Sequence, residues 1–187
     1  MKATKSKTSI LRFFKITALS LSTLFFLSLT PDRPLFTITG ICAENTKPVE
    51  GVLVSILIDG GAIAKCTTGA DGRYKLKLNF GKLVKVGFEK KGYLTQTVKL
   101  RTMLFGVSES EMTHQYNFEM LSLPNDSSAI TFDRSVDELM YDKETNTFVS
   151  NTEYKDGVQA DFEAVKKLIQ EQFIWLFQGQ YLATLLL

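Results

Sequence analysis

Between residues 35 and 100 the chain repeats one pattern about every ten residues: a short run rich in apolar and β-branched residues, closed by a turn signal. Such runs occupy Leu35–Cys42, Gly51–Ile58, Leu83–Phe88 and Thr95–Leu100. The turn signals between them are clusters of Asn, Pro, Gly and Asp, and no helical period appears. Short strands with this spacing are typical of an all-β sandwich, so the fold class is predicted to be mainly β.

The clearest hairpin of the predicted sandwich turns at Ala70–Gly72. The strand that follows, Arg73–Leu78, alternates without a fault. Tyr74, Leu76 and Leu78 are predicted to face the core, and the alternating basic residues Arg73, Lys75 and Lys77 are predicted to face water. Gly72 is expected to supply the positive φ that the turn needs.

Four segments carry a family resemblance: Ile38–Gly40, Pro48–Val54, Thr68–Tyr74 and Val86–Tyr93. In order, they match a first-strand glycine, a Pro-x-x-Gly-Val turn, a Thr-x-x-Asp-Gly hairpin and a Lys-x-Gly-Tyr ending. Residues of about 36–100 thus resemble the carboxypeptidase regulatory-like domain, with one departure at Gly69, where that family usually has a polar residue. The resemblance implies a transthyretin-like or immunoglobulin-like β-sandwich and a non-catalytic accessory module, common in bacterial envelope proteins.

Residues 1–30 are predicted to form a signal peptide or an N-terminal membrane anchor. The segment begins with basic residues and continues with the uncharged, apolar stretch Ile16–Leu29, which ends at Pro31. As a helix this stretch would span about 21 Å, short of the roughly 30 Å hydrocarbon core of a bilayer. Ser28 to Thr30 offer small residues for cleavage, but Pro31 is a poor residue after a cut. Export is expected, and whether the leader is removed stays open.

The C-terminal third is predicted to consist of a linker with short extended segments, residues 122–157, followed by an amphipathic helix and an apolar tail, residues 158–187. Apolar residues recur there at steps of three and four, which is the helical period. These residues are Phe162, Val165, Leu168, Ile169, Phe173 and Leu176. Glu163, Lys166, Lys167, Gln170 and Glu171 are predicted to lie opposite them.

The last fifteen residues, 173–187, carry no charge. Trp175 and Tyr181 are residue types that favour membrane interfaces, and the segment is too short to span a bilayer. Phe173, Trp175, Phe177 and Tyr181 are therefore predicted to contact a membrane surface or a partner. Packing of the whole apolar face on the sandwich is the alternative.

Catalytic and metal-binding residues are predicted to be absent. A zinc peptidase needs at least two imidazoles with a carboxylate, and the chain has one histidine, His114, in a polar stretch. The same shortage argues against a serine or cysteine hydrolase. Glycine-rich phosphate loops and spaced calcium-binding acids do not appear, so no cofactor is expected. Asp133 and Asp142 remain as an alternative acid–base pair.

Cys42 and Cys66 are the only cysteines. An even pair in an exported protein suggests a disulfide, and both fall on predicted strands of one sandwich. Two separate buried thiols that act as small apolar side chains are the alternative.

Charge makes nucleic acid a poor candidate partner. The formal charge is +2, but five basic residues lie in the first thirty, and the remainder has 17 basic and 20 acidic side chains. A weakly acidic body does not suit a phosphate backbone.

The sandwich, residues 35–121, is therefore expected to be a non-catalytic, exported module of a bacterial cell envelope. Its place is the periplasm or the envelope, with membrane association through the termini. Its role is expected to be structural or an interaction with a protein or glycan. A small-ligand carrier of transthyretin-like fold is the alternative, because such a fold can enclose a cavity.

Overall fold

The computed structural model describes residues 35–79, 83–102, 112–124, 129–142 and 144–185. The side chains of Leu35, Asn79 and residues 177–185 are outside this description. All of these residues belong to a compact unit that runs from Pro34 to Leu187. The predicted leader, residues 1–30, lies outside the described residues.

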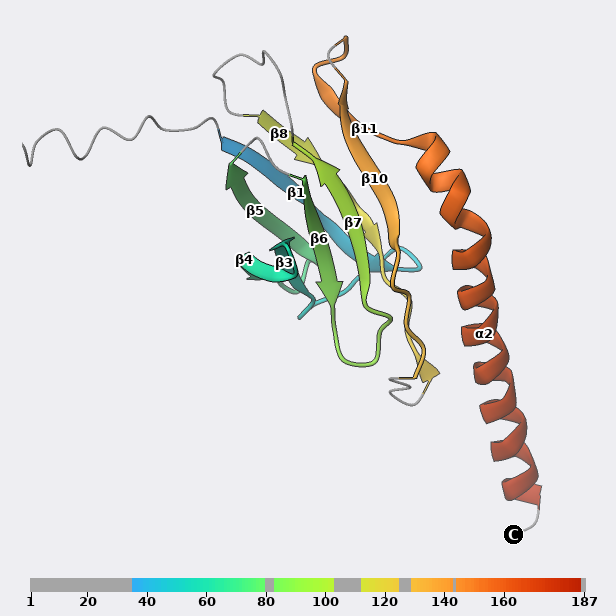
Figure 1. Cartoon of the computed structure of the whole chain (residues 1–187). Coiled ribbons are helices and arrows are strands. Elements are labelled where there is room, and N and C mark those ends of the chain that lie inside the picture. Colours follow the sequence, from blue (N-terminus) through green and yellow to red (C-terminus); the bar gives the residue numbers. More distant parts are fainter. Residues whose placement is uncertain (1–34, 80–82, 103–111, 125–128, 143, 186–187) are drawn as a thin grey trace, which may run out of the picture. The chain divides into compact units, whose positions relative to one another are not determined.

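The first sheet is built around the long strand β1, Leu35–Glu44 (Figure 1). It pairs antiparallel with β2 and β5, and parallel with β8 and β9. The partner strands are β2 (Lys47–Pro48), β5 (Arg73–Asn79), β8 (Met112–Gln115) and β9 (Phe118–Glu119). Segments far apart in the sequence therefore meet on one central strand.

The second sheet has six strands in the order β11-β10-β7-β6-β3-β4. β10 and β7 are parallel, and the other neighbouring pairs are antiparallel. The strands are β3 (Leu53–Ile58), β4 (Gly61–Thr67), β6 (Leu83–Glu89), β7 (Gln96–Arg101), β10 (Ser135–Asp142) and β11 (Thr147–Ser150).

The core takes side chains from both sheets. Phe36 and Ile38 of the first sheet and Val54 and Ile56 of the second belong to one cluster of buried residues. Phe88 of β6 stacks on Phe118 of β9, with ring centroids 3.8 Å apart. Because strands place alternate side chains on opposite faces, one face of each sheet supplies this core.

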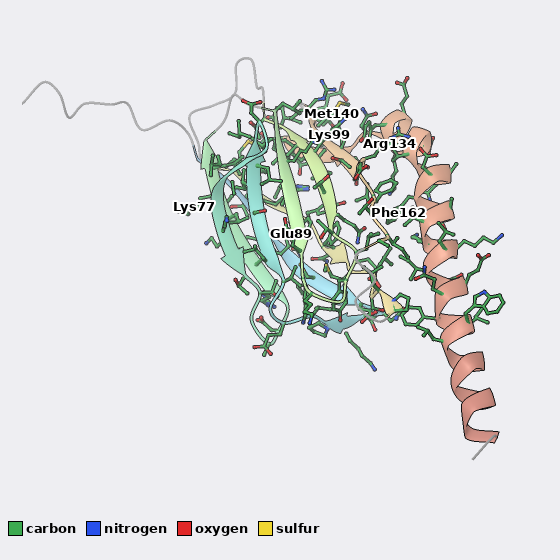
Figure 2. The ribbon with its side chains drawn as sticks, turned by 60° about the horizontal axis from the view of Figure 1, so that its bottom comes forward. Lys77, Glu89, Lys99, Arg134, Met140 and Phe162 are labelled. Carbon is green, nitrogen blue, oxygen red and sulfur yellow. The ribbon has the colours of Figure 1, made fainter. Side chains whose placement is uncertain are left out.

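The predicted fold class is confirmed: the protein is mainly β, with two sheets and a C-terminal helix. The alternation predicted for β5 is also confirmed. Tyr74, Leu76 and Leu78 are buried, whereas the basic residues between them are exposed. Lys77, labelled in Figure 2, is one of these exposed side chains.

Within residues 122–157, predicted as a linker with short extended segments, lie two strands of the second sheet. β10 pairs with β7 over Ser135–Met140, and β11 continues the sheet beyond β10. The helix α2, Thr152–Leu185, also begins earlier than predicted and contains Gly157. The sequence pattern did not indicate the pairing of β10 with β7, because β7 lies more than thirty residues earlier and periodicity does not show such a pairing.

Gly40 lies where no side chain fits. A Cβ atom at this position would lie 1.8 Å from the carbonyl oxygen of Tyr116 and 2.9 Å from the ring of Tyr74. The Tyr74 hydroxyl donates to that same carbonyl oxygen at 2.6 Å. The first-strand glycine of the resemblance therefore lets the chain after β8 approach β1 and lets Tyr74 bond to it.

Thr68 holds the turn that precedes β3. Its Oγ1 donates to the carbonyl of Val49 at 2.8 Å and accepts from the amide of Val52 at 2.9 Å. The Thr68 backbone completes the contact, because its amide donates to Val52 and its carbonyl accepts from Gly51. The Pro-x-x-Gly-Val turn and the Thr-x-x-Asp-Gly hairpin of the resemblance are thus two halves of one hydrogen-bonded structure.

Candidate functional site

Helix α2 is the element with an unusual surface, and its first turn is fixed by a cap. Asn151 precedes the helix, and its Oδ1 accepts from the amide of Tyr154 at 3.2 Å. The amide of Asn151 donates to the carbonyl of Glu138 at 2.7 Å. An asparagine that accepts from the third helical residue is a strong N-cap. This cap is the signal from which the true start of the helix could have been predicted.

Glu138 ties the helix start to the second sheet. The residue is 2% exposed, its Oε1 accepts from Arg101 Nε at 2.8 Å, and its Oε2 accepts from Asn151 Nδ2 at 2.6 Å. Burial acts to raise the pKa of the Glu138 carboxyl, but the hydrogen bonds from Arg101 and Asn151 outweigh it, so the pKa lies below its ordinary value. Both carboxylate oxygens therefore act as charged acceptors for the strand and the helix.

The first half of α2 packs beside the sandwich. Val158 and Ile169 are buried, and the ring of Phe162 lies 5.1 Å from that of Phe132. Arg134 forms an ion pair with Asp161 on the same side. Figure 2 shows Arg134 and Phe162 between the sheet and the helix. The spacing of four, seven and eleven residues from Val158 follows the predicted helical period.

The later part of α2 presents large apolar side chains to solvent. Trp175 is 74% exposed and Ile174 is 55% exposed, and Leu168 is exposed as well. Leu168 and Trp175 are seven residues apart, so they lie on one stripe of the helix. Phe173 is half-buried. The side chains of Phe177 and Tyr181 lie outside the described part, although the backbone there stays helical to Leu185.

Among the helices within the described ranges, none is both long enough and apolar enough to cross a membrane.

The acidic residues proposed as an acid–base pair do not come together. Asp133 precedes β10 and Asp142 ends it, and the eight residues of that strand span about 23 Å. Asp142 caps a turn, accepting from the Glu144 amide and the Thr145 hydroxyl. These bonds hold the pKa of Asp142 below its ordinary value.

His114 lies on β8, half-buried, with its ring centroid 5.7 Å from that of Phe148. Burial lowers the pKa of His114, because the charged imidazolium loses hydration there. In the part of the chain that the structure covers, no group of three or more His, Cys, Asp or Glu side chains is placed to hold a metal ion.

Cys42 and Cys66 are free thiols in the structure. Burial, and secondarily the neighbouring Cys66, raises the pKa of Cys42 to about 12, and burial also raises the pKa of Cys66. Both thiols are therefore protonated at neutral pH. The disulfide stays a prediction, and the mass of the purified protein after alkylation without reductant tests it. Two alkylated thiols would rule the bridge out.

No family model matches the chain. No curated protein matches it either. Similarity is found only with solved structures, and it is distant.

Catechol 1,2-dioxygenase from Acinetobacter sp. ADP1 is 10% identical, with a TM-score of 0.41, over 57% of this chain and 59% of that one. A DUF3823 family protein from Parabacteroides merdae is 15% identical, with a TM-score of 0.35, over 49% of this chain and 48% of that one. A candidate carbohydrate-binding protein from Bacteroides uniformis is 14% identical, with a TM-score of 0.34, over 48% of this chain and 42% of that one.

The prediction that the chain is not an enzyme is wrong as a conclusion from its fold, because dioxygenases are among the solved structures that it resembles. The chain spans about half the length of the three structures named above. At these TM-scores the likenesses carry no ligand, activity or partner over to this chain. The molecule itself shows a two-sheet β-sandwich with a helix that exposes Leu168, Ile174 and Trp175.

Proposed function

We propose that the chain is an exported β-sandwich module of a bacterial cell envelope that interacts with envelope components while the end of α2 rests on a membrane surface. The observation that carries this proposal is the exposed apolar surface of the helix around Ile174 and Trp175. Burying a side chain of this size gains about 2 kcal/mol. A protein that leaves several of them in water has a gain available from contact with an apolar phase.

The chemistry of the following segment supports a membrane surface as that phase. Residues 173–187 carry no charged side chain. No ion of this segment therefore has to lose its hydration when the end of α2 enters the headgroup region. Tryptophan combines an apolar ring with one donor, which suits the boundary between water and lipid. The first half of α2 is docked on the sandwich, so the sandwich would be held close to the surface that the helix end contacts.

The start of the sequence supports the exported location. A basic segment followed by an uncharged apolar stretch is the layout of a secretory signal. The resemblance of residues 36–100 to the carboxypeptidase regulatory-like domain supports an accessory role in the envelope. The Gly40 contact and the Thr68 bonds give the glycine and threonine of that resemblance a structural reason.

Trp175 is the only tryptophan, so intrinsic fluorescence reports on this one site. The full chain is mixed with vesicles of phosphatidylethanolamine and phosphatidylglycerol, with and without brominated acyl chains. We expect the emission of Trp175 to shift to shorter wavelength and to be quenched by the brominated lipid. This readout stays informative whether or not the leader also binds the vesicles.

Ile174→Ser should weaken the spectral shift, and the matched control is Ile63→Ser. Ile63 is 59% exposed on β4, close to the 55% of Ile174, but lies on another element. If the protein sediments with vesicles while Trp175 shows neither shift nor quenching, the helix end does not contact the membrane. If the emission of Trp175 shifts only when a protein fraction of the envelope is added, and not with vesicles, the helix end binds a protein partner instead of a membrane.

A further inference from the structure

A second surface feature, independent of the helix end, is a pocket between the two sheets where α2 runs past their edge. Its volume is about 370 Å³, and its walls come from β7, β10, the β8–β9 segment and α2. Gln96, Asp137, Tyr116, Phe118 and Phe162 are among the residues that line it. Pockets formed where separate elements meet are the usual place for small ligands.

Gln96 is the residue that requires an explanation. It is 1% exposed, and its Nε2 has no hydrogen-bond partner among the residues that the structure describes. Gln96 belongs to the inward face of β7, which otherwise carries Val98 and Leu100. A buried amide donor that finds no partner in the protein is uncommon, and a ligand or an ordered water usually satisfies it.

The acidic wall of the pocket is held in place by the fold. Asp137 Oδ2 accepts from the Tyr116 hydroxyl at 3.2 Å, and its Oδ1 accepts from the Glu138 amide at 2.7 Å and from the Ser150 hydroxyl. Burial and then the neighbouring Asp137 raise the pKa of Tyr116, so Tyr116 remains a neutral donor. Asp137 is thus a pre-positioned acceptor in the pocket that Gln96 also lines, and its partner on the neighbouring strand β7 is Val98, two residues after Gln96.

The charges of the lining favour an uncharged ligand. Two are negative, Glu119 and Asp137, and two are positive, Lys155 and Lys166, both of α2. Lys166 is already paired with Glu163 at 2.8 Å. With Glu163 counted, the set carries one excess negative charge, which gives an anion no attraction and a cation only a weak one.

The remaining wall is mixed: Asn117 and Gln159 contribute amides, and its apolar part is formed by Phe118, Leu121, Val136 and Phe162. A ligand that fits all of these features needs an acceptor for Gln96, a donor for Asp137 and an apolar face. A sugar ring has these groups, because its hydroxyls both donate and accept at the edge while its C–H groups form the faces. A simple ion lacks the apolar face, and a hydrocarbon would leave Gln96 unpaired.

We propose that this pocket binds one neutral sugar unit of a glycan, with Gln96 Nε2 donating to one sugar oxygen and the Asp137 carboxylate accepting from a neighbouring hydroxyl. Phe118 and Phe162 bound the C–H side of the ring. α2 forms one wall of the site, so the helix contributes to binding through its docked half. The end of the helix around Trp175 takes no part.

The test is a titration of isotope-labelled full chain with the methyl glycosides of glucose, galactose, mannose and N-acetylglucosamine, followed by NMR. We expect the side-chain amide signals of Gln96 to shift and saturate with at least one of these sugars. Gln96→Met keeps the length of the side chain and removes the amide. It should weaken binding at least tenfold while leaving the melting temperature unchanged or higher, since the unpaired donor is gone.

The matched control is Gln115→Met, the same change at an exposed position of β8. It should leave sugar binding as it is. If none of the four sugars moves the Gln96 signals, the pocket is only a hydration site and the proposal is wrong. Equal sugar affinity in Gln96→Met and the unchanged protein would also overturn it. Neither result depends on the fluorescence of Trp175. The proposal of a sugar site and the proposal of a membrane contact are therefore tested independently.

Discussion

The two parts of the sandwich are held by different chemistry. In the part that contains β1 to β7, the decisive contacts are a glycine against a carbonyl and a threonine hydroxyl that bonds two backbone groups, all of them neutral. In the part from β10 onward, the decisive contacts involve the carboxylates of Glu138 and Asp161 with the guanidinium groups of Arg101 and Arg134. The contacts named for the first part should therefore be indifferent to pH, whereas those named for the second should respond to it.

Gly40→Ala should have the largest effect, because the new methyl group meets a fixed carbonyl oxygen of Tyr116 rather than a flexible side chain. We expect a loss of about 3 kcal/mol or more in the free energy of unfolding. Urea denaturation measures it. Gly69→Ala is the control, since its Cβ would meet only Asp71 Oδ1 at 3.4 Å. Equal losses in the two variants would show that the Gly40 contact is not special.

Thr68→Val should have the second largest effect and lower the free energy of unfolding by about 2 kcal/mol. The change keeps the shape of the side chain but leaves the Val49 carbonyl and the Val52 amide without the hydroxyl. The loss should be the same at pH 7 and pH 4, because no charge is involved. Thr67→Val, at the exposed neighbouring position, is the comparison. A loss that changes with pH would contradict the division drawn above.

Glu138→Gln should cost about 1.5 kcal/mol at pH 7, because one charged acceptor is replaced by a neutral amide. The pKa of Glu138 is lower in the folded protein than its ordinary value of 4.5. The Glu138 carboxylate therefore contributes its full stabilisation above about pH 4.5. This stabilisation is lost as the pH falls through the pKa of the folded state. The difference between variant and parent should shrink on acidification. Thermal melts across this range check the sign, and a constant difference would mean that the carboxylate charge is not what holds α2.

Gly157→Ala should have the smallest effect and the opposite sign. Gly157 is exposed within α2, and a Cβ atom there would meet nothing within 4 Å. Alanine should stabilise the helix by about 0.5–1 kcal/mol. Circular dichroism during thermal unfolding measures the gain. A loss would mean that the first turns of α2 are not helical in solution.

The same contrast explains which parts of the fold follow from the sequence. The strands, the Ala70–Gly72 hairpin and the inward side of β5 depend on period two and on turn residues close in the chain. The pairing of β10 with β7 depends on contacts between distant segments, and nothing in the sequence around Ser135 indicates its partner. The helix was predicted from its period to begin at residue 158, so its first six residues, 152–157, were missed.

The sequence predicts only part of the pocket. Gln96 stands two residues before Val98 and four before Leu100, so alternation places an amide on the core side of a strand. That signal points to a buried polar group. It does not show that Asp137 and α2 line the same pocket, because they are distant from Gln96 in the sequence. The exposed side of the helix end, by contrast, was indicated by residue types alone.

The parallel pairing of β10 with β7 has a consequence for how the chain must be handled. A fragment that stops at residue 121 would contain the whole segment that resembles a known domain, yet it would leave β7 as an open edge with unpaired amide and carbonyl groups. Open strand edges join one another between molecules. Such a fragment should aggregate during folding, whereas the longer chain covers that edge with β10.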